Sequence, residues 1–160
     1  MFSFGKYLAM AAIGSLASAQ TAENRAAWPI IADMMDHWNA TWEPVTVVND
    51  DGYHLTMIHI TGTNRGPVQV SKPPLLVIHG MLTNCESWID PAIHTKTDPT
   101  VIKFADAGYD VYLGNVRGTR YGMPNDKLAW DSKEFWWFST YEQAIDDIPT
   151  MTKYIGDRTG

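Results

Sequence analysis

Two short apolar runs with β-branched residues predict two buried strands. Leu75–Ile78 is followed by His79-Gly80 and Tyr109–Leu113 by Gly114, and short apolar runs that glycine closes are typical of strands covered on both faces. Between them, Pro99–Ala107 is predicted to be a helix that Gly108 ends. A strand, a helix and a second strand in this order form a right-handed βαβ unit, so the two strands are expected to be parallel neighbours.

An earlier pair of strands is predicted on either side of a turn. Val45–Val48 and Tyr53–Ile60 are rich in strand-forming residues and flank Asn49–Gly52, a run of turn formers that ends in glycine. The second strand has apolar residues at both sets of alternating positions, so both of its faces are expected to be covered. His59 lies in this strand and is therefore interpreted as a hydrogen-bonded structural residue, not a catalytic one.

The last predicted element is a helix near the end of the chain. Its start is expected at Ser139 or Thr140, because Glu142 and Gln143 lie three residues further on and either pair can form a capping box. Apolar residues recur at helical spacing beyond that point. Pro149 falls inside this pattern, so a kink or a restart of the helix is expected there.

Together these elements predict an α/β fold, with a β-hairpin followed by a βαβ unit in a mostly parallel sheet. A long loop from Gly114 to Trp137 separates the sheet from the last helix. The 160 residues suit one domain, and the hydrophobic fraction of 45% is ample for a packed core. A net charge of −6 leaves no basic face for nucleic acid and no polybasic segment for anionic membranes.

The N-terminal residues have the three parts of a secretory signal peptide. A basic start at Met1–Lys6 precedes the short apolar stretch Tyr7–Leu16 and an A-x-A cleavage site at Ala17–Ala19. Residues 1–19 are therefore expected to be a signal peptide and residues 20–160 the mature domain, which would be secreted or lysosomal. After it, Trp28–Trp38 is predicted to be a short amphipathic helix. Asn39 opens the sequon Asn-Ala-Thr and is a candidate N-glycosylation site.

The sequence gives no support for metal or disulfide chemistry. Cys85 is the one cysteine, so a disulfide within the chain is impossible. It is interpreted either as a small, partly buried side chain or as a thiol that pairs outside this chain. The five histidines have no ligand-like spacing with one another or with Cys85, so no metal and no cofactor is predicted.

The candidate chemistry follows directly after the first buried strand, at His79-Gly80-Met81. Gly80 allows a tight turn and the close approach of a substrate. Backbone amides just past a strand end can stabilise a negative charge on a substrate oxygen, so the Met81 N–H is a candidate oxyanion-hole donor. An ordinary turn after a buried strand is the alternative. The nucleophile motif G-x-S-x-G occurs nowhere in the 160 residues, so no catalytic serine is assigned.

Several stretches resemble the acid lipase family, the α/β-hydrolases that include the gastric and lysosomal acid lipases. The resemblance covers about Asp33 to Gly160. Two positions depart from the family: Val116 stands where serine is usual, and Met81 where leucine is commoner. The stretches that carry the resemblance are Asp50–Tyr53, Val77–Leu82, Trp88-Ile89, Ala105–Gly118, Phe135–Ser139 and Asp147–Pro149.

The resemblance implies a serine-hydrolase mechanism on triacylglycerols or steryl esters, without a cofactor. It implies that Met81 donates to the oxyanion through its backbone N–H, supported by His79 and Gly80. The nucleophile is expected after Gly160, so this chain would be an α/β-hydrolase fold truncated before the nucleophile elbow and inactive alone. The alternative is a non-catalytic secreted paralogue or a lipid- or protein-binding fragment. A lipid ester, with contact to a lipid-droplet or membrane surface, is the expected partner, and no stable protein partner or nucleic acid is expected.

Two groups near the candidate site have two interpretations each. Asn115 and Arg117, in the loop after the second buried strand, either brace that loop through backbone hydrogen bonds, which is favoured, or take part in the site. Trp130 and the aromatic run Phe135–Phe138 either line an acyl pocket or wedge the long loop against the sheet.

Overall fold

The computed structural model describes residues 22–160, so the expected signal peptide lies outside the described residues. Residues 22–27 are helical and lead into α2 (Pro29–His37), whose first residue is a proline, a residue that suits the first position of a helix. The predicted amphipathic helix is confirmed, because α2 buries Ile31, Ala32 and Met35 against the rest of the molecule.

The sheet contains five strands, in the order β1-β2-β5-β4 with β3 beside β2. The predicted hairpin and the predicted βαβ unit are both present, and β4 and β5 are parallel neighbours. However, β1 with β2, β2 with β3 and β2 with β5 are antiparallel, so the described sheet is mostly antiparallel where a mostly parallel one was expected. The reason is that the one βαβ unit supplies one parallel pair, whereas the consecutive strands β1–β2 and β2–β3 and the long-range pair β2–β5 are antiparallel. The strands are β1 (Thr41–Val48), β2 (His54–Thr63), β3 (Gly66–Pro67), β4 (Pro74–Ile78) and β5 (Asp110–Gly114).

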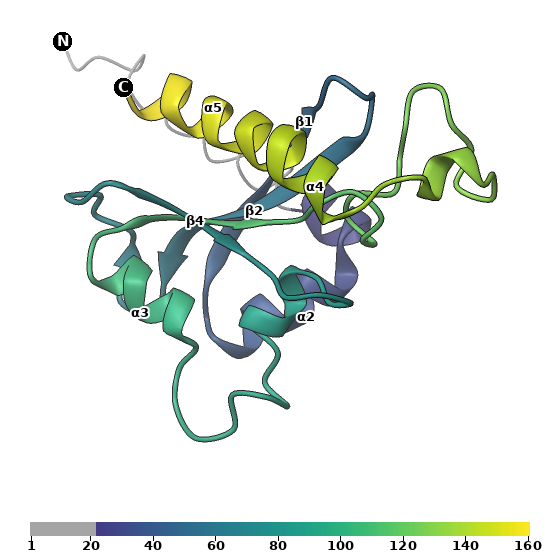
Figure 1. Ribbon diagram of the computed structural model, residues 1–160. Helices are drawn as coiled ribbons and strands as arrows, with labels where there is room; N and C mark the ends of the chain where they lie inside the picture. The colour runs from purple at the N-terminus through teal and green to yellow at the C-terminus, as the bar shows by residue number, and fades with distance from the viewer. Residues whose placement is uncertain (1–21) are drawn as a thin grey trace, which may run out of the picture.

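Helices cover both faces of the sheet, with α5 (Ile148–Thr159) on one side and α2 and α3 (Thr100–Asp106) on the other (Figure 1). Two apolar cores result. The core under α2 and α3 includes Ile58 and Ile60 of β2, and the core under α5 includes Leu55 and Met57 of the same strand. The prediction that this strand is covered on both faces is confirmed.

Ser139 is the N-cap of the last helical segment, which decides between the two predicted capping boxes. The Ser139 backbone N–H donates to Glu142 Oε2 at 2.7 Å in a capping box at the start of α4 (Thr140–Glu142). No restart follows at Pro149; instead a π-helical turn, η3 (Gln143–Asp147), leads directly into α5. Pro149 lacks an N–H and its ring crowds the preceding turn, and the wider π turn accommodates both effects.

Two further features place the candidate site. β4 forms one edge of the described sheet, and its C-terminal end lies beside that of β5, so the loops that follow the two strands are neighbours.

Within residues 22–160, no helix combines the length and the apolar character needed to cross a membrane.

Candidate active site

The turn after β4 lies on the rim of an open pocket of about 930 Å³. Much of the pocket wall is apolar and comes from the end of β4, the loop after β5 and the start of the last helix. Polar side chains of Thr83, Asn84, Arg120 and Gln143 also face it. Its principal apolar lining residues are Ile78, Met81, Leu82, Val116, Trp136, Phe138, Ala144 and Ile148.

The Gly80–Met81 peptide in this turn has a fixed orientation. The Gly80 carbonyl accepts hydrogen bonds from His79 Nδ1 at 2.8 Å and from Thr83 Oγ1 at 3.1 Å. In a trans peptide the N–H points away from the carbonyl, so the Met81 N–H is directed to the opposite side. Among residues 22–160 the Met81 N–H has no hydrogen-bond acceptor, which leaves it free for a ligand.

The turn is open on the side where a ligand would approach. A Cβ atom added at Gly80 would meet nothing within 4 Å, so packing does not require glycine there. Leu82 has a φ of +60° and is 99% exposed. A positive φ is uncommon outside glycine and asparagine, so this leucine is held in a strained conformation beside the free amide.

His79 contacts the neighbouring loop as well. The backbone N–H of Val116 donates to His79 Nε2 at 3.4 Å, a long hydrogen bond. Val116 makes this contact through its backbone and is 6% exposed in the core under α5. Valine in place of the serine usual in the acid lipases therefore does not remove the hydrogen bond to His79.

Asn115 and Arg117 brace the loop after β5, which was the favoured interpretation. The Asn115 side chain is fully buried, accepting from the Cys85 N–H at 2.9 Å and donating to the Thr56 carbonyl at 2.7 Å. The same burial raises the pKa of the Cys85 thiol to about 12. Arg117 is 2% exposed. Its side chain donates hydrogen bonds to carboxylates, whereas hydrogen bonds to backbone groups were expected.

The carboxylates around Arg117 come from two distant parts of the chain. Arg117 donates to Asp147 Oδ1 at 2.8 Å, to Asp51 Oδ2 at 2.6 Å and to Asp146 Oδ2 at 2.6 Å. Burial by itself lowers the pKa of Arg117, but the hydrogen bonds and charges of these carboxylates raise it above its ordinary value. Arg117 therefore stays charged and joins the hairpin turn to the last helix.

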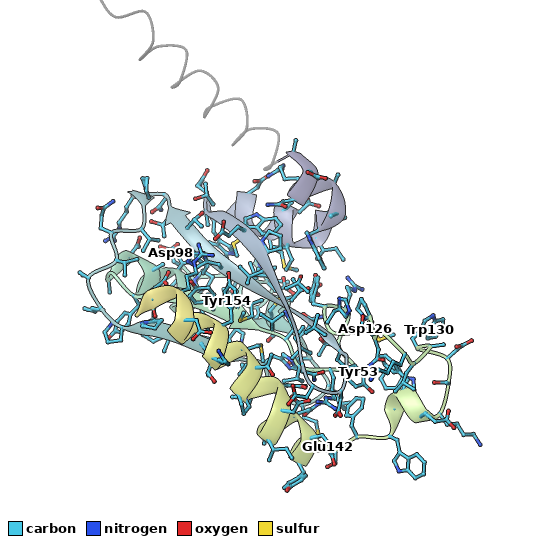
Figure 2. The ribbon with its side chains drawn as sticks, turned by 90° about the horizontal axis from the view of Figure 1, so that it is seen from above. Tyr53, Asp98, Asp126, Trp130, Glu142 and Tyr154 are labelled. Atoms are coloured by element: carbon cyan, nitrogen blue, oxygen red, sulfur yellow. The ribbon has the colours of Figure 1, made fainter. Side chains whose placement is uncertain are left out.

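The aromatic residues of the long loop divide between the two interpretations. Phe135 is fully buried and serves as the wedge: its ring lies 5.1 Å from that of Tyr53, whose hydroxyl donates to the Phe135 carbonyl. Figure 2 shows Tyr53 where the hairpin, the outlying loop and the start of the last helix meet, and Trp130 further out on that loop. Trp130 is 64% exposed and Trp137 86% exposed, and neither lines the pocket.

Trp136 and Phe138 are the aromatic residues that line the pocket. Gly118 lets them lie against the loop after β5, because a Cβ there would come within 2.6 Å of Phe138 Cζ and 3.2 Å of Trp136 Cζ3. Gly118 also has a φ of +79°, which favours glycine for a second reason. A single glycine thus sets the shape of one pocket wall.

His59 lies away from the pocket and is structural, as predicted. Its Nδ1 is 2.9 Å from Glu43 Oε1, its Nε2 is 2.6 Å from Asp110 Oδ1, and its ring stacks on Tyr112 with centroids 4.3 Å apart. Burial raises the pKa of Glu43, but the hydrogen bonds and charges of His59 and Arg158 outweigh it and hold that pKa below its ordinary value.

Three residues that shape the site were not predicted. Thr83 holds the Gly80 carbonyl, and Asp146 and Asp147 hold Arg117. Two signals pointed to them: a Thr three residues after a turn glycine often bonds backward to it, and a buried arginine requires carboxylates. Among residues 22–160 no group of three or more His, Cys, Asp or Glu could hold a metal ion.

Parts of the chain match a protein family and several known proteins. Residues 31–91 match the model of the family described as "Partial alpha/beta-hydrolase lipase region". The chain is 38% identical over 107 residues to a probable lipase of Schizosaccharomyces pombe, covering 66% of this chain and 23% of that protein. It is 33% identical over 131 residues to the gastric triacylglycerol lipase of Rattus norvegicus and 34% identical to that of Homo sapiens, covering 81% of this chain and 32% of each relative. The chain thus spans about a quarter to a third of the length of these relatives.

Proposed function

Because the chain belongs with the acid lipases, as a homologue of the gastric triacylglycerol lipases over part of their length, we propose that it supplies the oxyanion-hole part of a serine hydrolase of lipid esters. In this proposal residues 1–19 are a signal peptide and residues 20–160 form part of one lipase domain. The substrate is a triacylglycerol or a steryl ester, and no cofactor takes part.

One observation carries the proposal: the free Met81 N–H at the rim of an apolar pocket. As a nucleophile attacks an ester carbonyl, the carbonyl oxygen gains negative charge, and a donor already in place stabilises it without reorganisation. The Gly80 carbonyl is held from two sides, so the Met81 N–H has one orientation. The apolar lining of the pocket suits an acyl chain, and the open space at Gly80 leaves room for the ester group.

The nucleophile is proposed to lie in a segment that follows residue 160, with its histidine and acid further on. None of the serines within the 160 residues stands in G-x-S-x-G. In the proposed reaction that serine attacks the ester, the histidine takes and returns the proton, and the Met81 amide holds the oxyanion. The 160 residues alone are then expected to hydrolyse no ester.

The decisive experiment compares the 160-residue chain with a longer product of the same gene. The coding sequence after Gly160 is read for an in-frame G-x-S-x-G, and both proteins are assayed with p-nitrophenyl esters. Turnover by the longer protein alone, lost when the serine of that motif is replaced, supports the proposal. A stop codon directly after Gly160, with an inactive protein, would favour a non-catalytic binding fragment in its place.

Met81→Pro tests the amide directly in the longer protein. Proline removes the N–H and suits the turn position before a residue of positive φ. We expect kcat to fall by about 10²–10³, the usual cost of losing one oxyanion donor. Met81→Leu keeps the amide and serves as the control. A Met81→Pro protein as active as Met81→Leu would contradict the assigned role.

The rim of the pocket is proposed to contact a neutral lipid surface. Six large apolar side chains on or near it are 47–99% exposed, and the chain's net charge of −6 disfavours anionic lipids. These side chains are Met81, Leu82, Trp136, Trp137, Tyr141 and Ile145. Flotation with phosphatidylcholine-coated triolein droplets should recover the chain, and Trp137→Ser should lower that recovery; equal recovery would contradict the proposal.

Asn39 is proposed to carry an N-glycan, which goes with secretion or delivery to lysosomes. Asn39 is exposed and its φ is +50°, a conformation that asparagine and glycine accept best. Expression in secretory cells should therefore give a mass shift that peptide N-glycosidase removes. Asn39→Gly should abolish the shift while keeping the backbone conformation, and Thr41→Ser should retain it. A wild-type protein secreted without a glycan would rule the site out.

A further inference from the structure

The geometry points to a second role in the turn: we propose that His79 is the positioning residue of the Met81 amide and acts as a neutral ring that carries its hydrogen on Nδ1. One nitrogen fixes the Gly80–Met81 peptide and the other ties the turn to the loop after β5. The functional meaning of this role rests on the proposed oxyanion hole, but the arrangement itself can be measured without any hydrolysis.

The hydrogen-bond partners of His79 determine which nitrogen is protonated. The Gly80 carbonyl can only accept, so Nδ1, 2.8 Å away, must carry a hydrogen. The Val116 N–H can only donate, so Nε2, 3.4 Å away, must present a lone pair. One tautomer of the neutral ring satisfies both contacts, and a doubly protonated ring would set an N–H against the Val116 N–H.

This arrangement couples two loops that the sheet already places side by side. β4 and β5 are parallel, with Ile78 opposite Gly114, so the residues after them leave the same edge of the sheet. His79 lies between these loops and holds a backbone group of each. The direction of the Met81 N–H therefore depends on where the loop after β5 lies, as well as on the Thr83 hydroxyl, which holds the Gly80 carbonyl at 3.1 Å.

The first test is the protonation pattern of the ring in the full chain. Long-range ¹H–¹⁵N spectra of histidine-labelled protein at pH 8, where an ordinary imidazole is neutral, distinguish a nitrogen that carries hydrogen from one with a lone pair. The His79 ring signals are assigned in the wild-type chain by their correlation with the assigned His79 backbone signals. We expect a protonated Nδ1 and an unprotonated Nε2, and the opposite tautomer would overturn the proposal.

The second test separates the two contacts. An asparagine side chain places an amide near the position of Nδ1, and a glutamine places one near Nε2. His79→Asn should keep the bond to Gly80 and lose the one from Val116, so the Val116 amide should exchange hydrogen roughly 2- to 10-fold faster, the equivalent of one modest hydrogen bond. His79→Gln should keep that amide close to its wild-type rate. Equal Val116 exchange rates in wild type, His79→Asn and His79→Gln would overturn the proposal.

These outcomes are independent of catalysis. The tautomer is read from the wild-type chain, so the proposal stays testable even where a His79 variant does not fold. If the spectra show the expected tautomer but the longer gene product hydrolyses no ester, the proposed function fails and the positioning role remains as a structural fact. If the longer product is active but the tautomer is reversed, the failure belongs to His79 alone.

Discussion

At the scale of single residues, the turn after β4 combines strain with unused hydrogen-bonding capacity. Leu82 has a φ of +60°, and the Met81 amide beside it has no acceptor within the described part of the chain. Strain of this kind persists where surrounding contacts enforce it, and here the Thr83 hydroxyl and His79 hold the same turn. Stability is therefore reduced at the position where a ligand would bind.

Replacing Leu82 with glycine should relieve this strain. A left-handed backbone costs an ordinary L-residue about 1–2 kcal/mol. Glycine avoids this cost, but it also makes the unfolded chain more flexible, which offsets part of the gain in stability. We expect Leu82→Gly to raise the free energy of unfolding by roughly 0.5–1 kcal/mol in urea titrations. Leu82→Ala keeps the strain and is the matched control, so equal stability of the two variants would contradict the interpretation.

The Cys85 thiol should be unreactive in the folded protein. Its pKa is about 12, because burial disfavours the thiolate. At pH 8 a thiol of this pKa is ionised in about one molecule in 10⁴, compared with roughly a quarter for a thiol of ordinary pKa. Labelling with a maleimide should therefore be at least a hundredfold slower in buffer than in denaturant. Comparable rates would show that the Cys85 thiol is exposed in the folded protein.

At the scale of elements, the sequence predicted those whose signals are local. The hairpin, the helix ended by Gly108 and the Ser139 capping box follow from turn formers, caps and periodicity, and all three are present. The antiparallel pairing of β2 with β5 was missed, because it joins strands that are distant in the sequence and depends on tertiary packing. At Pro149 the sequence predicted a kink or a restart, and the structure has a π turn directly before it.

The same division holds at the candidate site. The sequence located His79-Gly80-Met81 because a strand end followed by glycine has a recognisable chemistry. It left open which aromatic residues face the pocket, because Phe135 and Phe138 have similar neighbours in the sequence. Their separation into the core and the pocket is decided by Tyr53 and Gly118, which lie far from them along the chain.

Glu43 of β1 should make stability depend on pH. It faces His59 of β2 and Arg158 of α5, and its pKa in the folded state is lower than its ordinary value of 4.5. A carboxyl with a depressed pKa stabilises the folded state above its unfolded pKa, and this contribution is lost as the pH falls below about 4.5 through the folded value.

Glu43→Gln should therefore lower stability at pH 7 and reduce the loss of stability between pH 5 and pH 3. Urea unfolding midpoints across this range measure both effects, and Glu134→Gln, at an exposed position in the long loop, is the control. Parallel pH profiles for wild type and Glu43→Gln would show that the ion pairs contribute nothing.

At the scale of the whole molecule, Asp147 joins three segments that are distant in the sequence. Its carboxylate accepts from Asn49 Nδ2 of the hairpin turn at 2.7 Å, and from the Arg117 backbone N–H and Nε, both at 2.8 Å. Arg117 follows Val116, which donates to His79, which in turn holds the Gly80 carbonyl. The last helix is thus linked to the candidate oxyanion amide through a series of hydrogen bonds that the peptide bonds Val116–Arg117 and Gly80–Met81 connect.

Asp147→Asn should be the most damaging of the substitutions considered. Removing one charge from a buried ion pair typically costs about 3–5 kcal/mol, because the remaining charge stays buried without compensation. Asp146 and Asp51 still contact Arg117, so we expect a loss of about 3 kcal/mol in urea unfolding. Asp157→Ala on the same helix breaks the exposed pair with Lys153 and should cost less than about 0.5 kcal/mol. If both variants lost equally little, the three segments would be held by apolar packing alone. A large loss confined to Asp147→Asn, together with faster hydrogen exchange at Val116, would show that the buried ion pair supports the turn beside Met81.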